Sequence, residues 1–262
     1  MPSEKLQVSF IQSNLVWENP EANLRLFSEK IDAIKQEVDL IVLPEMFTTG
    51  FTMHTSCVTP ELQEMSLEWM KTTAKKKNAR VMGSVIHHEN EAVFNRLWVV
   101  SPDGNQSFYD KKHLFTLAKE HEHFSAGKQK LLVEIKGWKI SPLICYDLRF
   151  PVWARNVEDY DLLLYVANWP EIRVNAWDAL LKARAIENMA YCLGVNRSGE
   201  DGKGFAYSGH SAMYDMLGNQ ISTQDNKSNE FVEVVELDYN ELQKTREKLG
   251  FLKDKDSFSL DI

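Results

Sequence analysis

The 262-residue sequence predicts a layered α/β sandwich with two β-sheets. Three observations lead to this prediction. Apolar strand-like runs alternate with amphipathic helical runs up to residue 87, which is typical of βαβ units. Two later strand pairs are separated only by short turns, which indicates antiparallel pairing within mixed sheets. Strands and helices then alternate again, so we do not expect a purely doubly wound sheet.

The first third of the chain has a βαβαβ order, with strands expected at 6–12, 39–43 and 79–87. Asn19-Pro20 and Thr59-Pro60 each match the N-cap and first position of a helix. The run 39–43 is mostly apolar, as expected of a central strand buried on both faces. Helical spacing relates Leu24, Phe27, Ile31, Ile34 and Val38 in the first helix, and Leu62, Met65, Trp69 and Thr73 in the second.

The next part of the chain contains two turns of hairpin type. Residues 102–105 separate strands at 92–100 and 106–111, and Lys136-Gly137 separates strands at 131–135 and 138–145. The remaining expected elements are strands at 161–167, 191–197 and 231–237, a segment at 209–215 that ends in a turn, and helices at 174–189 and 240–249.

Composition indicates one globular domain over residues 1–262, because the hydrophobic content of 44% and charged content of 26% are ordinary for an enzyme. The net charge of -8 argues against binding to nucleic acid or to an anionic membrane. No apolar run has the length of a signal peptide or membrane span. Three cysteines, Cys57, Cys145 and Cys192, suit neither a disulfide framework nor a Cys-x-x-Cys metal site, so we expect a cytoplasmic location.

The run from Leu143 to Pro151 places a cysteine at the end of an apolar strand. Pro151 is well placed to begin the next helix, so Cys145 is expected at the junction of strand and helix. Amides at a helix N-terminus lower the pKa of a thiol, and the thiolate is the nucleophilic form. The alternative is a small core residue, which is the common role of a single cysteine in an apolar strand.

Two other polar groups also follow strand-like runs. Glu45 comes after the strand at 39–43. One of Lys111 and Lys112 occupies the corresponding place at the end of the strand-like run 106–111. A cysteine hydrolase needs a nucleophile, a base that takes the thiol proton, and a positive or amide-rich site for the oxyanion. Glutamate, lysine and cysteine can fill these roles, although each residue alone is commonly a solvated or structural one.

Three segments together resemble the motifs of the nitrilase superfamily, the carbon-nitrogen hydrolases. They are Leu43–Phe47, Tyr109–Phe115 and Ile144–Pro151, in the order that the family has them. Within the superfamily the chain is most similar to the omega-amidase branch, through Tyr109–Phe115, Ala167–Pro170 and Lys182–Asn188. The resemblance covers nearly the whole chain. It implies a four-layer αββα sandwich, commonly paired as a homodimer, and amide hydrolysis through a thioester without a metal or organic cofactor.

By this resemblance, Glu45 is the general base, Cys145 the nucleophile and Lys111 the residue that stabilises the tetrahedral intermediate. Lys111 is chosen over its neighbour because the family lysine stands two places before His-Leu-Phe, and strand alternation allows only one of the two to point inward. Glu120 matches a second family glutamate, which either positions the lysine or assists proton transfer. The backbone amide of Tyr146 is the expected partner of Lys111 in the oxyanion hole.

An omega-amidase acts on the side-chain amide of small 2-oxo acids such as 2-oxoglutaramate and 2-oxosuccinamate. Its pocket must therefore bind a carboxylate at the far end of the substrate. Arg173 is either this contact or a surface arginine. Phe47, Phe51 and Trp169 form either an aromatic wall that limits substrate length or ordinary core packing. Arg149 is expected to brace the turn that follows the nucleophile.

Other functions are also considered. A nitrilase, an N-carbamoyl hydrolase, a deaminated-glutathione amidase and a non-catalytic scaffold of the same fold remain open alternatives. A cysteine phosphatase needs arginine six places after the thiol, where this chain has Pro151. A papain-like protease needs a histidine base, and no histidine stands in a comparable motif. A metal site at His121 and His123, flanked by Glu120 and Glu122, lacks a matched further ligand.

Overall fold

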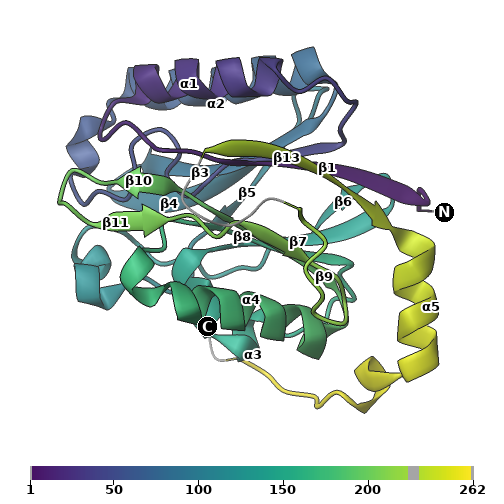
Figure 1. Ribbon diagram of the computed structural model, residues 1–262. Helices are drawn as coiled ribbons and strands as arrows, with labels where there is room; N and C mark the ends of the chain where they lie inside the picture. Colours follow the sequence, from purple (N-terminus) through teal and green to yellow (C-terminus); the bar gives the residue numbers. More distant parts are fainter. Residues whose placement is uncertain (1, 224–229, 261–262) are drawn as a thin grey trace.

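The computed structural model describes residues 2–223 and 230–260. Two large β-sheets pack face to face, and helices cover the outer face of each sheet (Figure 1). This arrangement confirms the four-layer αββα sandwich. Within the described residues, no helix combines the length and apolarity needed to cross a bilayer.

The first sheet has six strands in the order β13-β1-β2-β3-β4-β5. The strands β1, β2 and β3 of the βαβαβ opening are parallel, and β4 and β5 add antiparallel neighbours. β13 closes the other edge antiparallel to β1, so segments from the two ends of the chain lie side by side. The bounds are β1 Lys5–Gln12, β2 Leu40–Val42, β3 Arg80–Glu89, β4 Ala92–Val100, β5 Gln106–Asp110 and β13 Phe231–Asp238.

The second sheet has five strands in the order β12-β9-β8-β7-β6. Its central strands β7, β8 and β9 are parallel, and the two edge strands are antiparallel to them. A separate hairpin of β10 and β11, which the sequence did not predict, follows β9. The bounds are β6 Val133–Ile135, β7 Trp138–Ile144, β8 Leu162–Ala167, β9 Tyr191–Asn196, β10 Ser198–Glu200, β11 Ala206–Ser208 and β12 Ala212–Tyr214.

The helices form the two outer layers. In Figure 1, α1 and α2 lie above the first sheet, and α3 and α4 lie below the second. The helix bounds are α1 Pro20–Asp32, α2 Pro60–Lys77, α3 Pro151–Ala154, α4 Val174–Asn188 and α5 Tyr239–Leu249. Short 3-10 helices span η1 Thr55–Cys57, η2 Thr116–Ala118, η3 Glu120–Glu122, η4 Cys145–Arg149, η5 Glu171–Arg173 and η6 Phe251–Asp254.

Successive residues of the first sheet face two different cores. Val42 and Tyr109 belong to the core between the sheets, whereas Ile41 and Val81 belong to the core under α1 and α2. Because side chains alternate along a strand, Lys111 continues the face of Tyr109 and points between the sheets. The fold thereby directs the Lys111 side chain toward the second sheet.

The first helix is shorter than its apolar spacing predicted. α1 ends at Asp32, where the backbone N–H of Ala33 donates to the Glu29 carbonyl and that of Ile34 donates to the Ile31 carbonyl. The chain must then reverse direction to enter β2, which a continued helix would prevent. Ile34 and Val38 are buried all the same, because the connecting segment packs them against the core under α1 and α2.

Candidate active site

A cavity of about 320 Å³ opens where strands of both sheets end. Lys111 follows β5 of the first sheet, whereas Cys145 follows β7 and Asn168 follows β8 of the second. All three line the cavity. The carboxyl ends of parallel strands in α/β folds are the usual place for such a site.

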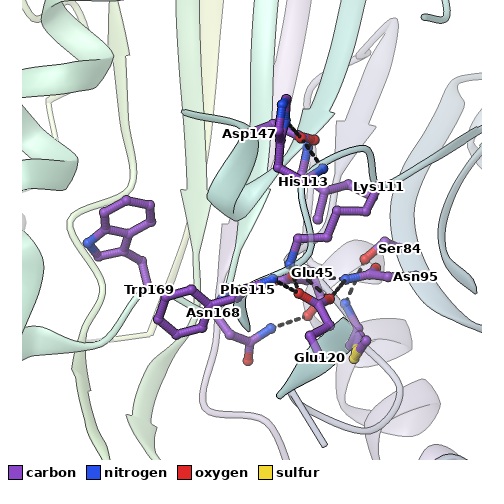
Figure 2. Close-up of polar contacts among 12 residues, drawn as sticks. Glu45, Ser84, Asn95, Lys111, His113, Phe115, Glu120, Asp147, Asn168 and Trp169 are labelled. Carbon is purple, nitrogen blue, oxygen red and sulfur yellow. Dashed lines mark hydrogen bonds and ion pairs between the residues drawn. The ribbon is translucent and has the colours of Figure 1, made fainter. Parts of the chain in front are cut away.

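A cluster of ionisable side chains lies beside the cavity floor. The Nζ atom of Lys111 donates to Glu45 Oε1 at 2.9 Å and to both carboxylate oxygens of Glu120 at 3.0 Å (Figure 2). All three side chains are fully buried. Glu45 follows β2, and Glu120 lies in η3, so two loops of the first sheet bring their carboxylates to one lysine.

The charges of the cluster stabilise one another. Burial alone lowers the pKa of Lys111, but the carboxylates of Glu120 and Glu45 outweigh it and hold the lysine pKa well above its ordinary value. Burial raises the pKa of Glu120, which Lys111 partly offsets. Lys111 is therefore a permanent cation at neutral pH.

Cys145 sits on a sharp turn between β7 and η4. Its backbone φ of 44° is in the left-handed region, which few residues other than glycine adopt. The side chain is half-buried and lines the cavity. Such a strand-to-helix elbow presents a nucleophile to a pocket.

The expected lowering of the thiol pKa is wrong. Burial raises the pKa of Cys145 well above its ordinary value, and the Glu45 carboxylate raises it further by its charge and by a hydrogen bond to the thiol. Lys111 opposes this effect without reversing it. The helix after Cys145 is only a 3-10 turn followed by the four-residue α3, so its dipole is small. The thiol is protonated at neutral pH and needs a base.

Comparisons with known proteins agree with this geometry. A family model described as carbon-nitrogen hydrolase matches residues 7–247. The chain belongs to the carbon-nitrogen hydrolase family. It is 46% identical to the omega-amidase YafV of Escherichia coli over 97% of this chain and 98% of that protein. It is 32% identical to a 2-oxoglutaramate amidase of Bacillus subtilis over 95% and 97% of the two chains.

A solved structure shows the same architecture. A carbon-nitrogen hydrolase superfamily protein from Xanthomonas campestris, described with an arsenic adduct in its active site, superposes with a TM-score of 0.91 at 38% identity. The match covers 99% of this chain and 100% of that chain. The present protein is accordingly a hydrolase of amide-type carbon-nitrogen bonds.

Two asparagines of this hydrolase hold the carboxylates in place, and sequence reasoning missed both. Asn95 on β4 donates through Nδ2 to Glu45 at 2.8 Å and to Glu120 at 3.4 Å. Asn168 donates through its backbone N–H to Glu45 Oε2 at 2.8 Å, and its side-chain amide bonds the Glu45 carbonyl oxygen at 2.5 Å. Asn168 directly follows a buried strand, as Cys145 does, and this shared position was the available signal.

The cavity walls are partly aromatic. Phe51 and Trp169 line it, together with Tyr146 and Phe115, whose rings meet edge to face at 5.0 Å. Trp169 also donates through its ring N–H to the carbonyl oxygen of Arg173 at 2.8 Å. The backbone amide of Tyr146 is at the second position of η4, where no carbonyl of that helix can accept its hydrogen.

Phe47 is not part of the wall. Its side chain is fully buried on the other face of the first sheet, where it packs against Phe27 at 5.6 Å and Trp69 at 5.7 Å. The turn after Glu45 causes this placement, since Met46 has a φ of 43° and the Phe47 N–H bonds the Ser84 carbonyl. The ring belongs to the core under α1 and α2.

Three cationic side chains line the cavity, and Arg149 and Lys203 are exposed, so this group forms the cavity rim. Arg149, Arg173 and Lys203 line it, and none of them forms an ion pair with a described residue. Arg149 does not brace the turn through Asp147 as expected: its guanidinium stacks over the Trp169 ring at 4.9 Å. The only lining carboxylate of the described residues, Asp201, is engaged by its own loop. The rim therefore favours an anionic ligand group.

Metal-ligating geometry is not found at His121 and His123, which are exposed. Among the described residues, the group with suitably close donor atoms is Glu18, His54 and Cys57. Its Glu18 and His54 side chains are already joined by a hydrogen bond of 3.0 Å.

Proposed function

We propose that this hydrolase is an omega-amidase that releases ammonia from 2-oxoglutaramate and 2-oxosuccinamate. The observation that carries the proposal is the division of the cavity into a floor, where Cys145 lies beside Glu45 and Lys111, and a rim, whose cations form no ion pair within the described part of the chain. A monoamide of a dicarboxylic acid needs these two ends. Similarity to omega-amidases at 45–46% identity supports the same substrate class.

The first step is attack by sulfur. Glu45 accepts the thiol proton through the hydrogen bond that Cys145 makes to it. The sulfur then bonds to the amide carbon, and the carbonyl oxygen becomes an oxyanion. The Lys111 ammonium and the Tyr146 amide stabilise that charge. Lys111 is suited to this role because the two carboxylates keep it protonated and fixed in place.

The intermediate then expels ammonia. Glu45 returns its proton to the departing nitrogen, the carbon-nitrogen bond breaks, and a thioester with Cys145 remains. A water molecule enters, Glu45 takes one of its protons, and the hydroxide attacks the thioester carbon. The carbon-sulfur bond breaks, sulfur recovers a proton, and the carboxylic acid leaves. Glu120 positions Lys111 throughout rather than exchanging a proton, because both of its oxygens contact the lysine.

Arg173 is proposed to bind the far carboxylate of the substrate, with Arg149 beside it on the rim. Both lack an ionic partner among the described side chains, and a guanidinium can bind a carboxylate through two parallel hydrogen bonds. Phe51 and Trp169 are proposed to limit the substrate length between floor and rim.

Three further features of the protein are also proposed. One domain over 1–262 is supported by the uninterrupted family match over residues 7–247. A cytoplasmic location is supported by the three free cysteines. A homodimer is supported by three exposed apolar side chains, here called the apolar face: Val152 on α3, Ile186 on α4 and Leu217 in the turn after β12.

A substrate panel tests the function. Ammonia release is measured from 2-oxoglutaramate, 2-oxosuccinamate and deaminated glutathione, and turnover of a nitrile and an N-carbamoyl amino acid is followed in parallel. We expect the highest kcat/KM for the two 2-oxo acid amides, and Cys145→Ala should lower their turnover by about 10⁴-fold or more. Activity confined to the nitrile, or survival of turnover in Cys145→Ala, would refute the proposal. Cys192→Ser, at a buried cysteine away from the cavity, is the matched control.

A further inference from the structure

The buried carboxylate of Asp147 contacts the segment that carries the nucleophile. Asp147 is the third residue of η4 and is fully buried. Its Oδ2 atom accepts a hydrogen bond of 3.1 Å from the backbone N–H of Ile144, the residue directly before Cys145. The carboxylate therefore fixes the backbone at the point where β7 turns into the elbow.

The same carboxylate also contacts the segment that carries the lysine. Oδ2 accepts from the Tyr109 hydroxyl at 2.7 Å, and Oδ1 accepts from the backbone N–H of His113 at 3.0 Å and from its ring Nδ1 at 2.8 Å. Tyr109 and His113 stand two residues before and two residues after Lys111. Figure 2 shows Asp147 and His113 near one end of the Lys111 side chain and the two glutamates near the other.

These two segments belong to different sheets, because Lys111 follows β5 and Cys145 follows β7. Neighbouring contacts extend the connection on both sides. The Trp153 ring N–H donates to the Tyr109 hydroxyl at 3.0 Å, and the His113 ring stacks on Phe150 with centroids 3.6 Å apart. One side chain thus joins the ends of two sheets at the floor of the cavity.

We propose that Asp147 is a positioning residue that sets the separation of Cys145 and Lys111, an inference that rests on the proposed function of that site. Asparagine cannot replace it. Each carboxylate oxygen accepts a backbone N–H, from Ile144 on one side and His113 on the other. Whichever way a side-chain amide is turned, its NH₂ group faces one of these donors and loses the bond.

The variant Asp147→Asn tests this role. Kinetics are measured on whichever amide of the panel the wild-type protein hydrolyses best, so a different preferred substrate would refute the omega-amidase assignment without affecting this test. We expect kcat per titratable Cys145 thiol to fall about 100-fold, because misplacement of reacting groups by about 1 Å lowers the rate by about that factor. KM should change less than about threefold. Tyr109→Phe, which removes one of the four donors, should give an intermediate loss.

Asp161→Asn is the matched control. Asp161 is a buried carboxylate directly before β8, at the end of the second sheet opposite to Cys145. It accepts a hydrogen bond from the Lys139 backbone N–H at 2.9 Å and one from Arg246 at 2.8 Å. This variant should lower the melting temperature as Asp147→Asn does, but keep kcat within about twofold of wild type.

Hydrogen exchange provides a readout that needs no substrate. In Asp147→Asn, amide exchange should accelerate at residues 109–113 and 144–150 together, and in Asp161→Asn at neither segment. A folded Asp147→Asn with kcat within twofold of wild type, or with faster exchange in only one segment, would overturn the inference.

Discussion

The charge of Glu45 has opposite consequences for the two groups beside it. It helps to keep Lys111 protonated, and it also disfavours the thiolate of Cys145. A protein that needed a resting thiolate would not place a carboxylate there. The arrangement instead suits a nucleophile that loses its proton only as it attacks, since the group that disfavours the thiolate is also the group that receives the proton.

Glu45→Gln should therefore separate reactivity of the thiol from turnover. Removing the negative charge lowers the pKa of Cys145, because a neighbouring carboxylate disfavours the thiolate and Lys111 remains. Alkylation of Cys145 by iodoacetamide, followed by mass spectrometry from pH 6 to 10, should have its midpoint at lower pH than in wild type. Amide turnover should fall by about 10² to 10⁴-fold through loss of the general base.

Glu122→Gln, a change at an exposed neighbour of Glu120, should leave both measurements unchanged. An alkylation midpoint in Glu45→Gln that stays the same or moves to higher pH would contradict this account of the thiol.

Among single residues, the sequence motifs identified the expected catalytic side chains. They did not identify the asparagines that hold the carboxylates in place. Glu45, Lys111 and Cys145 each follow a strand, which is visible in the sequence. Asn95 lies in the middle of β4 and contacts two carboxylates from other loops, which no local pattern indicates. The pKa of the thiol was predicted in the wrong direction because burial and the position of Glu45 depend on tertiary packing.

Among the elements, the β10–β11 hairpin has a direct link to the cavity. Its loop contributes Lys203 and Phe205 to the wall. Asp201 holds that loop, since Oδ1 accepts the backbone N–H groups of both residues at 2.9 and 3.0 Å and Oδ2 accepts the Tyr207 hydroxyl at 2.9 Å. The carboxylate keeps one side of the substrate site in a single conformation.

Asp201→Ala should loosen this wall without altering the floor. We expect KM for 2-oxoglutaramate to rise about tenfold, which corresponds to about 1.4 kcal/mol of lost binding, with kcat within about threefold of wild type. Steady-state kinetics check this expectation. Asp215→Ala is the matched control, because Asp215 accepts two backbone N–H groups in a similar turn away from the cavity. A fall in kcat with unchanged KM would contradict the assigned role.

Most elements could be predicted because strand periodicity, N-caps and turn residues act locally. Thr59 and Asn19 cap their helices as expected. The end of α1 and the β10–β11 hairpin could not be predicted, since they depend on where the chain must meet another part of the fold. Ile34 lies beyond the end of α1 but continues the apolar spacing of that helix. The reason is that its side chain packs into the same core as the apolar side chains of α1.

For the whole molecule, the exposed face of Val152, Ile186 and Leu217 leads to a prediction about assembly. These side chains are 50%, 45% and 50% exposed. If this face joins two copies, Ile186→Glu would place charges opposite apolar groups and should convert a dimer of twice 30.2 kDa to a monomer of 30.2 kDa in light scattering after size exclusion. Ile172→Glu, at an isoleucine that is 84% exposed outside this face, should keep the wild-type mass. A wild-type protein that is monomeric would contradict the proposed dimer.

The pairing of β1 with β13 places Lys5 opposite Asp238, so one edge of the first sheet joins residues that are 233 positions apart in the sequence. On a ribosome, β1 emerges long before its partner is made. The growing chain therefore carries an unpaired apolar strand edge through most of its synthesis. Such an edge can pair with strands of other chains and lead to aggregation. This topology makes folding slow relative to local helical proteins. Recovery of amidase activity after dilution from denaturant would then follow the docking of the two sheets, because neither sheet alone holds both Lys111 and Cys145.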